Sequence, residues 1–373
     1  MLERPIFVVG TMRSGSTLFR LILDAHPHIA ISEETGFMGG LLAAERIPGW
    51  VHGEGWYERL GWSQEEFDAR LREFYAGLFD RHARAEGKQR WGDKTPFHSA
   101  HIAEMARIFP DSVVVAIVRH PGAVVHSLVG KFHYTVGDAV AYWDSTNKEI
   151  LRRGAELGGR RFALLRYEDL VEHPEETLHE LVDFLGEPWS DDLLRHQEIQ
   201  AARGTPRVSA GKTGTRDPIT TDLAHRWAEG LAPDDRALIT GGAGPLARFL
   251  GYEPTEPGAL GPLVPEGRSG PRRLLTGDVL AERVRGSGAA LLDDTATAVI
   301  EPDMSPAELA RRLHQAEAAL ARVRSSRAVR WTHAARRAQR RVAGVPVELF
   351  SAAGEVVRAR ARQRSDRGPS RPA

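Results

Sequence analysis

Continuous apolar runs alternate with stretches of helical apolar spacing along residues 1–252 of the chain. The runs at 6–9, 112–118 and 162–166 are typical of strands that are buried on both faces of a sheet. After the first run, the apolar residues of 18–25 lie three and four positions apart, which is the spacing of an amphipathic helix. This alternation predicts an α/β fold in which helices flank a parallel sheet.

Weaker local signals predict the elements between these strands. Residues 29–31 have the pattern of a second short strand, Gly92 to Pro96 that of a turn, and 97–108 that of a helix. Aromatic residues gather at 50–62, and an amphipathic helix follows whose apolar stripe is predicted to face the core. That stripe comprises Phe67, Leu71, Phe74, Tyr75 and Leu78.

Composition divides the chain beyond the folded domain predicted for residues 1–252. Residues 253–306 are rich in proline and glycine and are predicted to be a linker that holds no more than one weak helix. Residues 307–345 combine a short heptad spacing of apolar residues with many arginines, which predicts a basic amphipathic helix. Such a helix suits contact with an anionic membrane surface or a partner. Residues 346–373 are predicted to be largely disordered, which completes a C-terminal helical and disordered extension.

The 50 basic and 50 acidic residues balance over the whole chain, but they are unevenly distributed. From residue 301 onward there are 16 arginines and 7 acidic residues, so this part is basic and the remainder mildly acidic. The absence of cysteine excludes disulfides, thiolate zinc sites and a cysteine nucleophile from this sequence. We expect neither a signal peptide nor a membrane span of about 20 apolar residues. The expected protein is cytoplasmic, at most peripheral to the inner membrane face, with no specific nucleic-acid partner.

The loop between the first predicted strand and helix has the layout of a phosphate cradle. Its glycines, Gly10 and Gly15, have the spacing of a nucleotide-triphosphate loop, and Ser16 and Thr17 can cap the helix that follows. Ser16, however, stands where such a loop carries its phosphate-binding lysine. The loop therefore favours an anion smaller than a magnesium triphosphate, with Arg13 as the local cation.

Charged residues near other predicted strands extend this candidate site. Glu34 follows the second predicted strand, and Arg119 follows the valine-rich strand. Because the carboxyl ends of parallel strands share one edge of a sheet, both residues are expected where α/β proteins bind ligands. Lys94 lies in the predicted turn, and Ser127 lies about two turns into the helix after Arg119. From the pattern alone, each of these residues has an alternative interpretation as an ordinary surface or helix residue.

In their order and spacing, these segments resemble the sulfotransferases that use 3′-phosphoadenosine 5′-phosphosulfate (PAPS). The resemblance is to the branch that contains the tyrosylprotein sulfotransferases and their bacterial relatives, and it covers about residues 5–252. The segments that carry it are RSGSTLFRLILDAHP from Arg13, EET at 33–35, DKTPF at 93–97, VRHPGAVVHS from Val118 and RYEDLVEHPE from Arg166. The sequence shows neither the membrane anchor nor the cysteines of the Golgi enzymes, so protein-tyrosine specificity is not implied.

The resemblance implies a PAPS-binding site that is built from several segments. The loop would hold the 5′-phosphosulfate group through Arg13, Ser14, Gly15, Ser16 and Thr17. Arg119 and Ser127 match the residues that bind the 3′-phosphate in this family, and Tyr167 matches a tyrosine that contacts the cofactor. A later basic loop, 207–216, would cover the cofactor through Ser209 and Lys212.

The resemblance also implies the catalytic groups. Glu34 falls where this branch carries its base, and Lys94 falls where it carries a lysine beside the transferring sulfuryl group. Lys94 and Arg13 would stabilise the charge that develops during transfer, so no metal is expected. His98 is the alternative base; together with His101 it lacks the third ligand that a metal site needs.

Other function classes stay open from the sequence alone. A P-loop kinase of a small molecule would require ATP and magnesium, and Ser16 in the lysine position argues against it. A non-catalytic scaffold would act through its basic tail and tolerate changes at Arg13 and Glu34. For a sulfotransferase, the aromatic residues at 50–62 favour a carbohydrate, glycolipid or phenolic hydroxyl as acceptor. The composition favours a bacterial source, and the oligomeric state is left open.

Overall fold

The computed structural model describes most of the first 292 residues of the chain. The described residues are 4–42, 55–132, 134–203, 217–254, 256, 260–264 and 272–292. All of them belong to one compact unit, Met1–Thr297. The predictions made for 307–345 and 346–373 concern residues that lie outside this described part.

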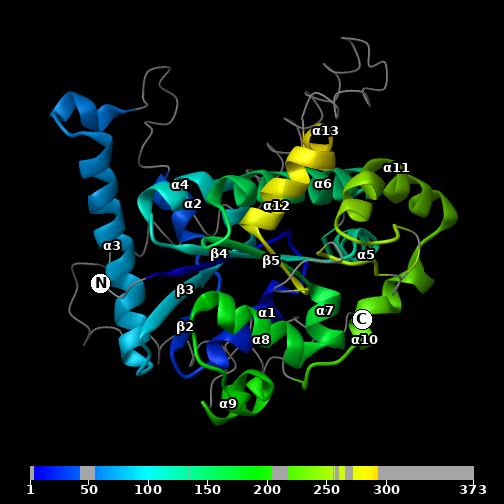
Figure 1. Ribbon diagram of the computed structural model, residues 1–373, viewed down its shortest axis with the longest axis horizontal. Coiled ribbons are helices and arrows are strands. Elements are labelled where there is room, and N and C mark those ends of the chain that lie inside the picture. Colours follow the sequence, from blue (N-terminus) through cyan, green and yellow to red (C-terminus); the bar gives the residue numbers. More distant parts are fainter. Residues whose placement is uncertain are drawn as a thin grey trace, which may run out of the picture. The chain divides into compact units, whose positions relative to one another are not determined.

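A six-stranded sheet organises the described part of the chain (Figure 1). The strands are β1 Ile6–Val9, β2 Ile29–Ile31, β3 Arg90–Lys94, β4 Val113–Val118, β5 Phe162–Arg166 and β6 Leu274–Thr276. In space they follow the order β2-β3-β1-β4-β5-β6, and strands β1 to β5 run parallel. Strand β6 pairs with β5 in the antiparallel direction and forms one edge. The α/β fold predicted from the apolar runs is confirmed.

Helices cover both faces of this sheet. They are α1 Ser16–Ala25, α2 Phe37–Leu42, α3 Gln64–Ala85, α4 Ile102–Ile108, α5 Pro121–Phe132, α6 Val136–Leu157, α7 Tyr167–Glu172, α8 Pro174–Leu185, α9 His196–Ala202, α10 Asp222–His225, α11 Pro233–Phe249, α12 Gly277–Arg283 and α13 Ala289–Leu292. The short 3₁₀ helices are η2 Trp56–Leu60, η3 Pro96–His101, η4 Asp191–Leu193 and η5 Arg226–Gly230. None of the helices in the described ranges is both long and apolar enough to cross a membrane.

Two hydrophobic clusters lie on opposite sides of the sheet. Figure 1 shows α1 and α8 on one face, and α4, α6 and α12 on the other. Successive side chains of a strand point to opposite faces, so Ile6 and Val8 of β1 join one cluster while Phe7 and Val9 join the other. This burial on both faces explains why β1, β4 and β5 are continuous apolar runs in the sequence.

Strand β3 shows that the turn predicted for 92–96 is wrong. The five residues of β3, RWGDK, are all buried, although three of them carry a charge. Arg90 is stabilised by distant groups: it donates to the carbonyl oxygens of Arg4 at 2.6 Å and Leu185 at 2.8 Å. Gly92 allows the close pairing, because a Cβ there would lie 2.7 Å from the Ile6 carbonyl oxygen. Partners of this kind stabilise buried polar groups, and a local pattern does not reveal them.

The prediction that the whole apolar stripe of helix α3 faces the core is wrong in part. Leu71 and Tyr75 are buried, but Phe74 is 57% exposed and Leu78 is 48% exposed. The helix packs against β3, α4 and β2, and Figure 1 shows it at the end of the sheet that holds β2 and β3. A helical stripe that is wider than the contact surface therefore leaves apolar side chains in contact with solvent.

Part of the predicted linker belongs to the fold. Within 253–306, residues 274–276 form strand β6, whose Leu275 lies opposite Leu164 of β5. Helix α12 follows and packs against α6, with Leu280 buried. The proline- and glycine-rich flanks conceal these elements, because a three-residue strand and a seven-residue helix are too short to show a clear period.

A buried histidine connects the end of β4 to the segment after α11. The Nδ1 of His120 accepts the backbone N–H of Gly122 at 3.0 Å, and its Nε2 donates to the Glu253 carbonyl at 2.9 Å. The ring also stacks on Trp227, with centroids 4.3 Å apart. Burial lowers the pKa of His120 to about 4, and the bond that Nδ1 accepts from Gly122 requires the neutral imidazole.

We predict that this histidine makes the fold sensitive to acid. The pKa of His120 is lower in the folded chain than its ordinary value of 6.5. Its contribution to stability is therefore complete above about pH 6.5 and decreases as the pH falls toward about 4, by up to about 3 kcal/mol. Urea unfolding between pH 7.5 and 4.5 measures this loss of unfolding free energy. His120→Gln should be less stable at pH 7.5 and should lose less stability on acidification; an equal loss would contradict the prediction.

Candidate active site

The loop after β1 has a backbone shape that few residues other than glycine adopt. Gly15 has a φ of 91° and Arg13 a φ of 71°, both in the left-handed region. Helix α1 begins at Ser16, so Gly15 is its N-cap residue and makes no side-chain capping bond. The predicted caps Ser16 and Thr17 are instead inside the first turn of the helix. Their position leaves the backbone N–H groups of this turn available to an anion.

Gly15 also has a steric reason to be glycine. A Cβ at this position would lie 2.3 Å from Cδ2 of Tyr167, the first residue of α7. The tyrosine ring thus lies against the loop, although 152 residues separate the two in the sequence. The structure thereby brings together the predicted loop and the predicted cofactor-contacting tyrosine.

Two arginines meet beside this loop. The Nε of Arg13 donates to the Ser127 hydroxyl at 2.8 Å, and Nη1 of Arg119 donates to the Arg13 carbonyl at 3.3 Å. The Arg119 guanidinium lies over the Tyr167 ring, 4.3 Å from its centroid. Burial and the charge of Arg119 lower the pKa of Arg13, while Glu34 opposes this shift. Two partly buried like charges at one place favour the binding of an anion between them.

Unpaired polar atoms add to the anion-binding character of this place. Among the described residues, Nε of Arg119 and the hydroxyls of Ser14 and Thr11 are buried and have no hydrogen-bond partner. Buried polar atoms usually have one. A ligand with several acceptor oxygens would supply partners for them, so the chemistry of the cradle fits a phosphate- or sulfate-bearing group.

The predicted base and its lysine form an ion pair. Lys94 is the last residue of β3 and is 1% exposed, whereas the Glu34 side chain is 38% exposed. The Lys94 ammonium contacts the Glu34 carboxylate and lies 3.4 Å from the Thr17 hydroxyl of the loop. The structure therefore places a carboxylate and an ammonium at the edge of the sheet where the anion-binding loop begins.

The alternative base, His98, is buried within the fold. It is 1% exposed, and its Nε2 lies 3.8 Å from Oδ2 of Asp93. Burial lowers the pKa of His98, and Asp93 opposes the shift. Since an acceptor molecule needs access to the base, the more exposed Glu34 is the better placed of the two candidates.

Some predicted residues lie outside the described part of the chain. These are Ser209 and Lys212 of the covering loop, and Trp50 of the aromatic cluster. Of the rest of that cluster, Tyr57 stacks on Phe67 at the start of α3, with centroids 4.2 Å apart. This contact identifies Tyr57 as a residue that packs against α3.

Sequence reasoning missed several residues that hold the site in shape. The Ser99 hydroxyl of η3 accepts the Gly10 N–H at 3.1 Å, and the Tyr142 hydroxyl accepts the Met12 N–H at 2.9 Å. The Trp143 indole donates to the Arg119 carbonyl at 2.9 Å. The two aromatic residues are consecutive in α6, where Trp143 is buried and Tyr142 is partly buried. No signal in the sequence separates these roles from ordinary packing.

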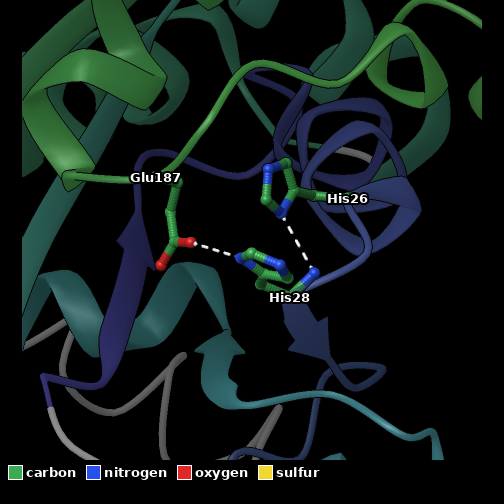
Figure 2. A group of neighbouring side chains, drawn as sticks. All are labelled: His26, His28 and Glu187. Atoms are coloured by element: carbon green, nitrogen blue, oxygen red, sulfur yellow. Dashed lines mark hydrogen bonds and ion pairs between the residues drawn. The ribbon is translucent and has the colours of Figure 1, made fainter.

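A second group of side chains has the spacing of a metal site but is already hydrogen-bonded. The ligand atoms of His26, His28 and Glu187 lie within 4.8 Å of one another (Figure 2). His26 accepts the His28 N–H on Nδ1 at 3.1 Å, so its proton is on Nε2, which donates to the Pro188 carbonyl at 2.8 Å. Glu187 bonds His28 at 3.0 Å and the Arg90 guanidinium at 3.1 Å. Because these groups are engaged and a cation is adjacent, we assign the cluster to the fold.

The geometry defines an α/β protein with a candidate anion-binding loop at the carboxyl edge of its parallel sheet. Residues 5–191 match the model of the sulfotransferase family, and the chain belongs to this family. It is 30% identical to protein-tyrosine sulfotransferase 2 of Gallus gallus over 266 residues, which cover 68% of this chain and 70% of that protein. Protein-tyrosine sulfotransferase of Drosophila melanogaster is 29% identical over 266 residues, which cover 68% of this chain and 52% of the relative.

Two solved sulfotransferase structures align with part of this chain. The sulfotransferase domain of a Synechococcus olefin synthase is 26% identical, with a TM-score of 0.46, and the match covers 65% of this chain and 96% of the domain. A mouse sulfotransferase in complex with PAP is 11% identical, with a TM-score of 0.37, and covers 64% of this chain and 84% of that chain. The family expected from the sequence motifs is confirmed.

We predict that Gly15 and Gly61 respond differently to the same substitution. Both glycines have positive φ, but a Cβ at Gly61 would meet nothing within 4 Å, whereas one at Gly15 would overlap Tyr167. Gly61→Ala should cost about 1 kcal/mol of unfolding free energy from backbone strain. Gly15→Ala should cost about 1–3 kcal/mol more, because the ring must move. Denaturant unfolding of both variants measures the difference; equal losses would contradict the close contact.

Proposed function

We propose that the protein transfers the sulfuryl group of PAPS to a hydroxyl of an aromatic acceptor. The observation that carries this proposal is the convergence of two groups at one sheet edge: the Arg13–Ser127–Arg119 cluster and the Lys94–Glu34 pair. Membership in the sulfotransferase family supports sulfuryl transfer. The unpaired polar atoms of the cradle support a donor that carries several anionic oxygens.

The chain's own residues suggest how the donor is held. The N–H groups of the loop from Arg13 to Thr17 bind one anionic group, with help from the left-handed turn at Gly15. Arg119 and Ser127 bind a second phosphate, and the Tyr167 ring stabilises the Arg119 guanidinium by a cation–π contact. PAPS, when bound, supplies an activated sulfuryl group and a stable bisphosphate leaving group.

Glu34 and Lys94 have complementary roles in this proposal. The Glu34 carboxylate accepts the proton of the attacking hydroxyl, which raises the nucleophilicity of its oxygen. The Lys94 ammonium is fixed by β3 and supplies positive charge where negative charge increases during transfer. In the ligand-free chain the two groups neutralise each other, which lowers the cost of keeping Lys94 almost fully buried.

Aromatic residues lie three positions after each member of this pair in the sequence, and they favour a phenolic acceptor over the other predicted classes. Phe37 follows Glu34 by three residues, and Phe97 follows Lys94 by three residues. Phe97 is 64% exposed, and Phe37 stacks on Tyr75, with centroids 5.5 Å apart. Aromatic walls suit planar acceptors, and the relatives named above are protein-tyrosine sulfotransferases. Carbohydrate and glycolipid hydroxyls are the alternatives for an acceptor screen.

The donor is tested by calorimetric titration with 3′,5′-adenosine bisphosphate in EDTA, and separately with ATP and magnesium. We expect tight binding of the bisphosphate without metal and no binding of ATP, because the loop lacks the lysine of a triphosphate site. Arg119→Ala should weaken the binding of the bisphosphate at least tenfold by removing a charge-assisted bond. Binding of ATP alone would favour the kinase alternative. Binding of neither ligand would favour the scaffold alternative.

The base is tested by replacing Glu34 and its neighbour. Glu34→Ala should lower the rate of sulfuryl transfer from PAPS to a phenol by about 10²–10⁴-fold, the usual contribution of a general base. The affinity for 3′,5′-adenosine bisphosphate should stay nearly unchanged. Glu33→Ala is the matched control, since it removes an adjacent exposed carboxylate. Equal rates for Glu34→Ala and the unaltered protein would identify another group as the base.

A further inference from the structure

The segment that carries Glu34 lies across the end of strand β3. The side chain of Glu34 contacts Lys94, and the side chain of the next residue, Thr35, donates to Oδ2 of Asp93 at 3.2 Å. Adjacent residues of a strand point to opposite faces of the sheet, so Asp93 and Lys94 lie on different sides of β3. Two successive residues of the Glu34 segment thus contact two successive residues of β3.

Asp93 is a buried carboxylate whose partners are hydroxyl groups. It is 0% exposed. Tyr75 of α3 donates to its Oδ2, and Thr95 donates to its Oδ1 at 3.4 Å. Burial and the Asp93 charge raise the pKa of Tyr75 far above its ordinary value, so the phenol remains a donor. A buried carboxylate is costly unless it is hydrogen-bonded, and here three elements of the fold supply the donors.

The same hydroxyl groups fix the backbone that follows Glu34. The Phe37 N–H donates to the Thr35 hydroxyl at 3.1 Å, and the Gly36 N–H donates to the Thr95 hydroxyl at 3.3 Å. Thr35 and Thr95 therefore each connect Asp93 to the backbone of the Glu34 segment. This arrangement anchors Thr35, the residue after Glu34, to Asp93 of β3, while the Glu34 side chain contacts Lys94.

We propose that Thr35 and Asp93 are positioning residues that hold the Glu34 carboxylate against Lys94. The inference rests on the proposed function in one respect, since it takes Glu34 as the base. Neither Thr35 nor Asp93 touches the reacting atoms; both act through the Glu34 segment. Loss of the Thr35 hydroxyl would leave the fold in place and let the Glu34 carboxylate move, and misplacement by about 1 Å costs about 10²-fold in rate.

Thr35 is the better residue for the test, because it is exposed and its substitution disturbs no packing. Thr35→Val keeps the shape of the side chain but removes the donor, and Thr35→Ser keeps the donor. We expect Thr35→Val to lower kcat about tenfold to hundredfold, with the affinity for 3′,5′-adenosine bisphosphate nearly unchanged. The melting temperature should also stay nearly unchanged, because Tyr75 and Thr95 still donate to Asp93. Thr35→Ser should restore most of the rate. Ser32→Ala is the control, since that hydroxyl donates to the adjacent Glu33 carbonyl at 3.1 Å.

A second measurement asks whether Thr35 acts through Glu34. In a Glu34→Ala background, Thr35→Val should cause no further loss of rate, because the group that it positions is absent. A loss that persists in this background would overturn the proposal. Equal rates for Thr35→Val and Thr35→Ser would overturn it too. So would a decrease in kcat that is matched by a lower melting temperature.

A readout without turnover separates this inference from the proposed function. Carbodiimide labelling of carboxylates, followed by mass spectrometry, measures how freely Glu34 moves away from Lys94. Thr35→Val should increase the labelling rate of Glu34 several-fold, and the rate at Glu33 should stay constant as an internal reference. An unchanged Glu34 rate would overturn the inference, even in a protein that transfers sulfuryl groups. Faster labelling in a protein that does not bind the bisphosphate would support it and refute the proposed function.

Discussion

The parallel pairing of β1 with β3 on one side and β4 on the other is the constraint on which the site depends. Val8 lies opposite Lys94 of β3 and opposite Val115 of β4. The loop after β1 therefore emerges between Lys94 and Arg119, the residue after β4. Parallel strands require long crossovers, so the residues of the site come from segments far apart in the chain. Their proximity is a property of the sheet and not of any one segment.

Electrostatics explains why this edge suits a multiply charged anion. Arg13, Arg119 and Lys94 are partly or fully buried near one loop. In the described residues, Arg119 contacts backbone carbonyls and the Tyr167 ring, which are weaker counterparts than a phosphate. Glu34 pairs with Lys94, and its charge also opposes the lowering of the pKa of Arg13. The fold thus maintains like charges close together, and an anion that binds between them relieves their repulsion.

Strand β3 joins the two halves of the candidate site. Its Lys94 side chain reaches the Thr17 hydroxyl of the loop at 3.4 Å, and its Asp93 side chain reaches Tyr75 of α3 on the other face. A buried strand with three charged residues is stable because distant segments provide each charge with partners. Because the Asp93 and Lys94 side chains of β3 are bonded to other segments, the strand also fixes the distance between the loop after β1 and the Glu34 segment.

The sequence by itself determined strands β1, β4 and β5, because burial on both faces requires consecutive apolar residues. It also located the loop, since the spacing of Gly10 and Gly15 is a local requirement, and it placed the chain in its family through short motifs. Only the tertiary structure decided that RWGDK is a strand, that Phe74 and Leu78 are exposed, and that residues 274–276 complete the sheet. It also decided the pairing of Glu34 with Lys94, which lie 60 positions apart. These features depend on partners from remote segments, and a local pattern carries no information about which remote residues will be neighbours.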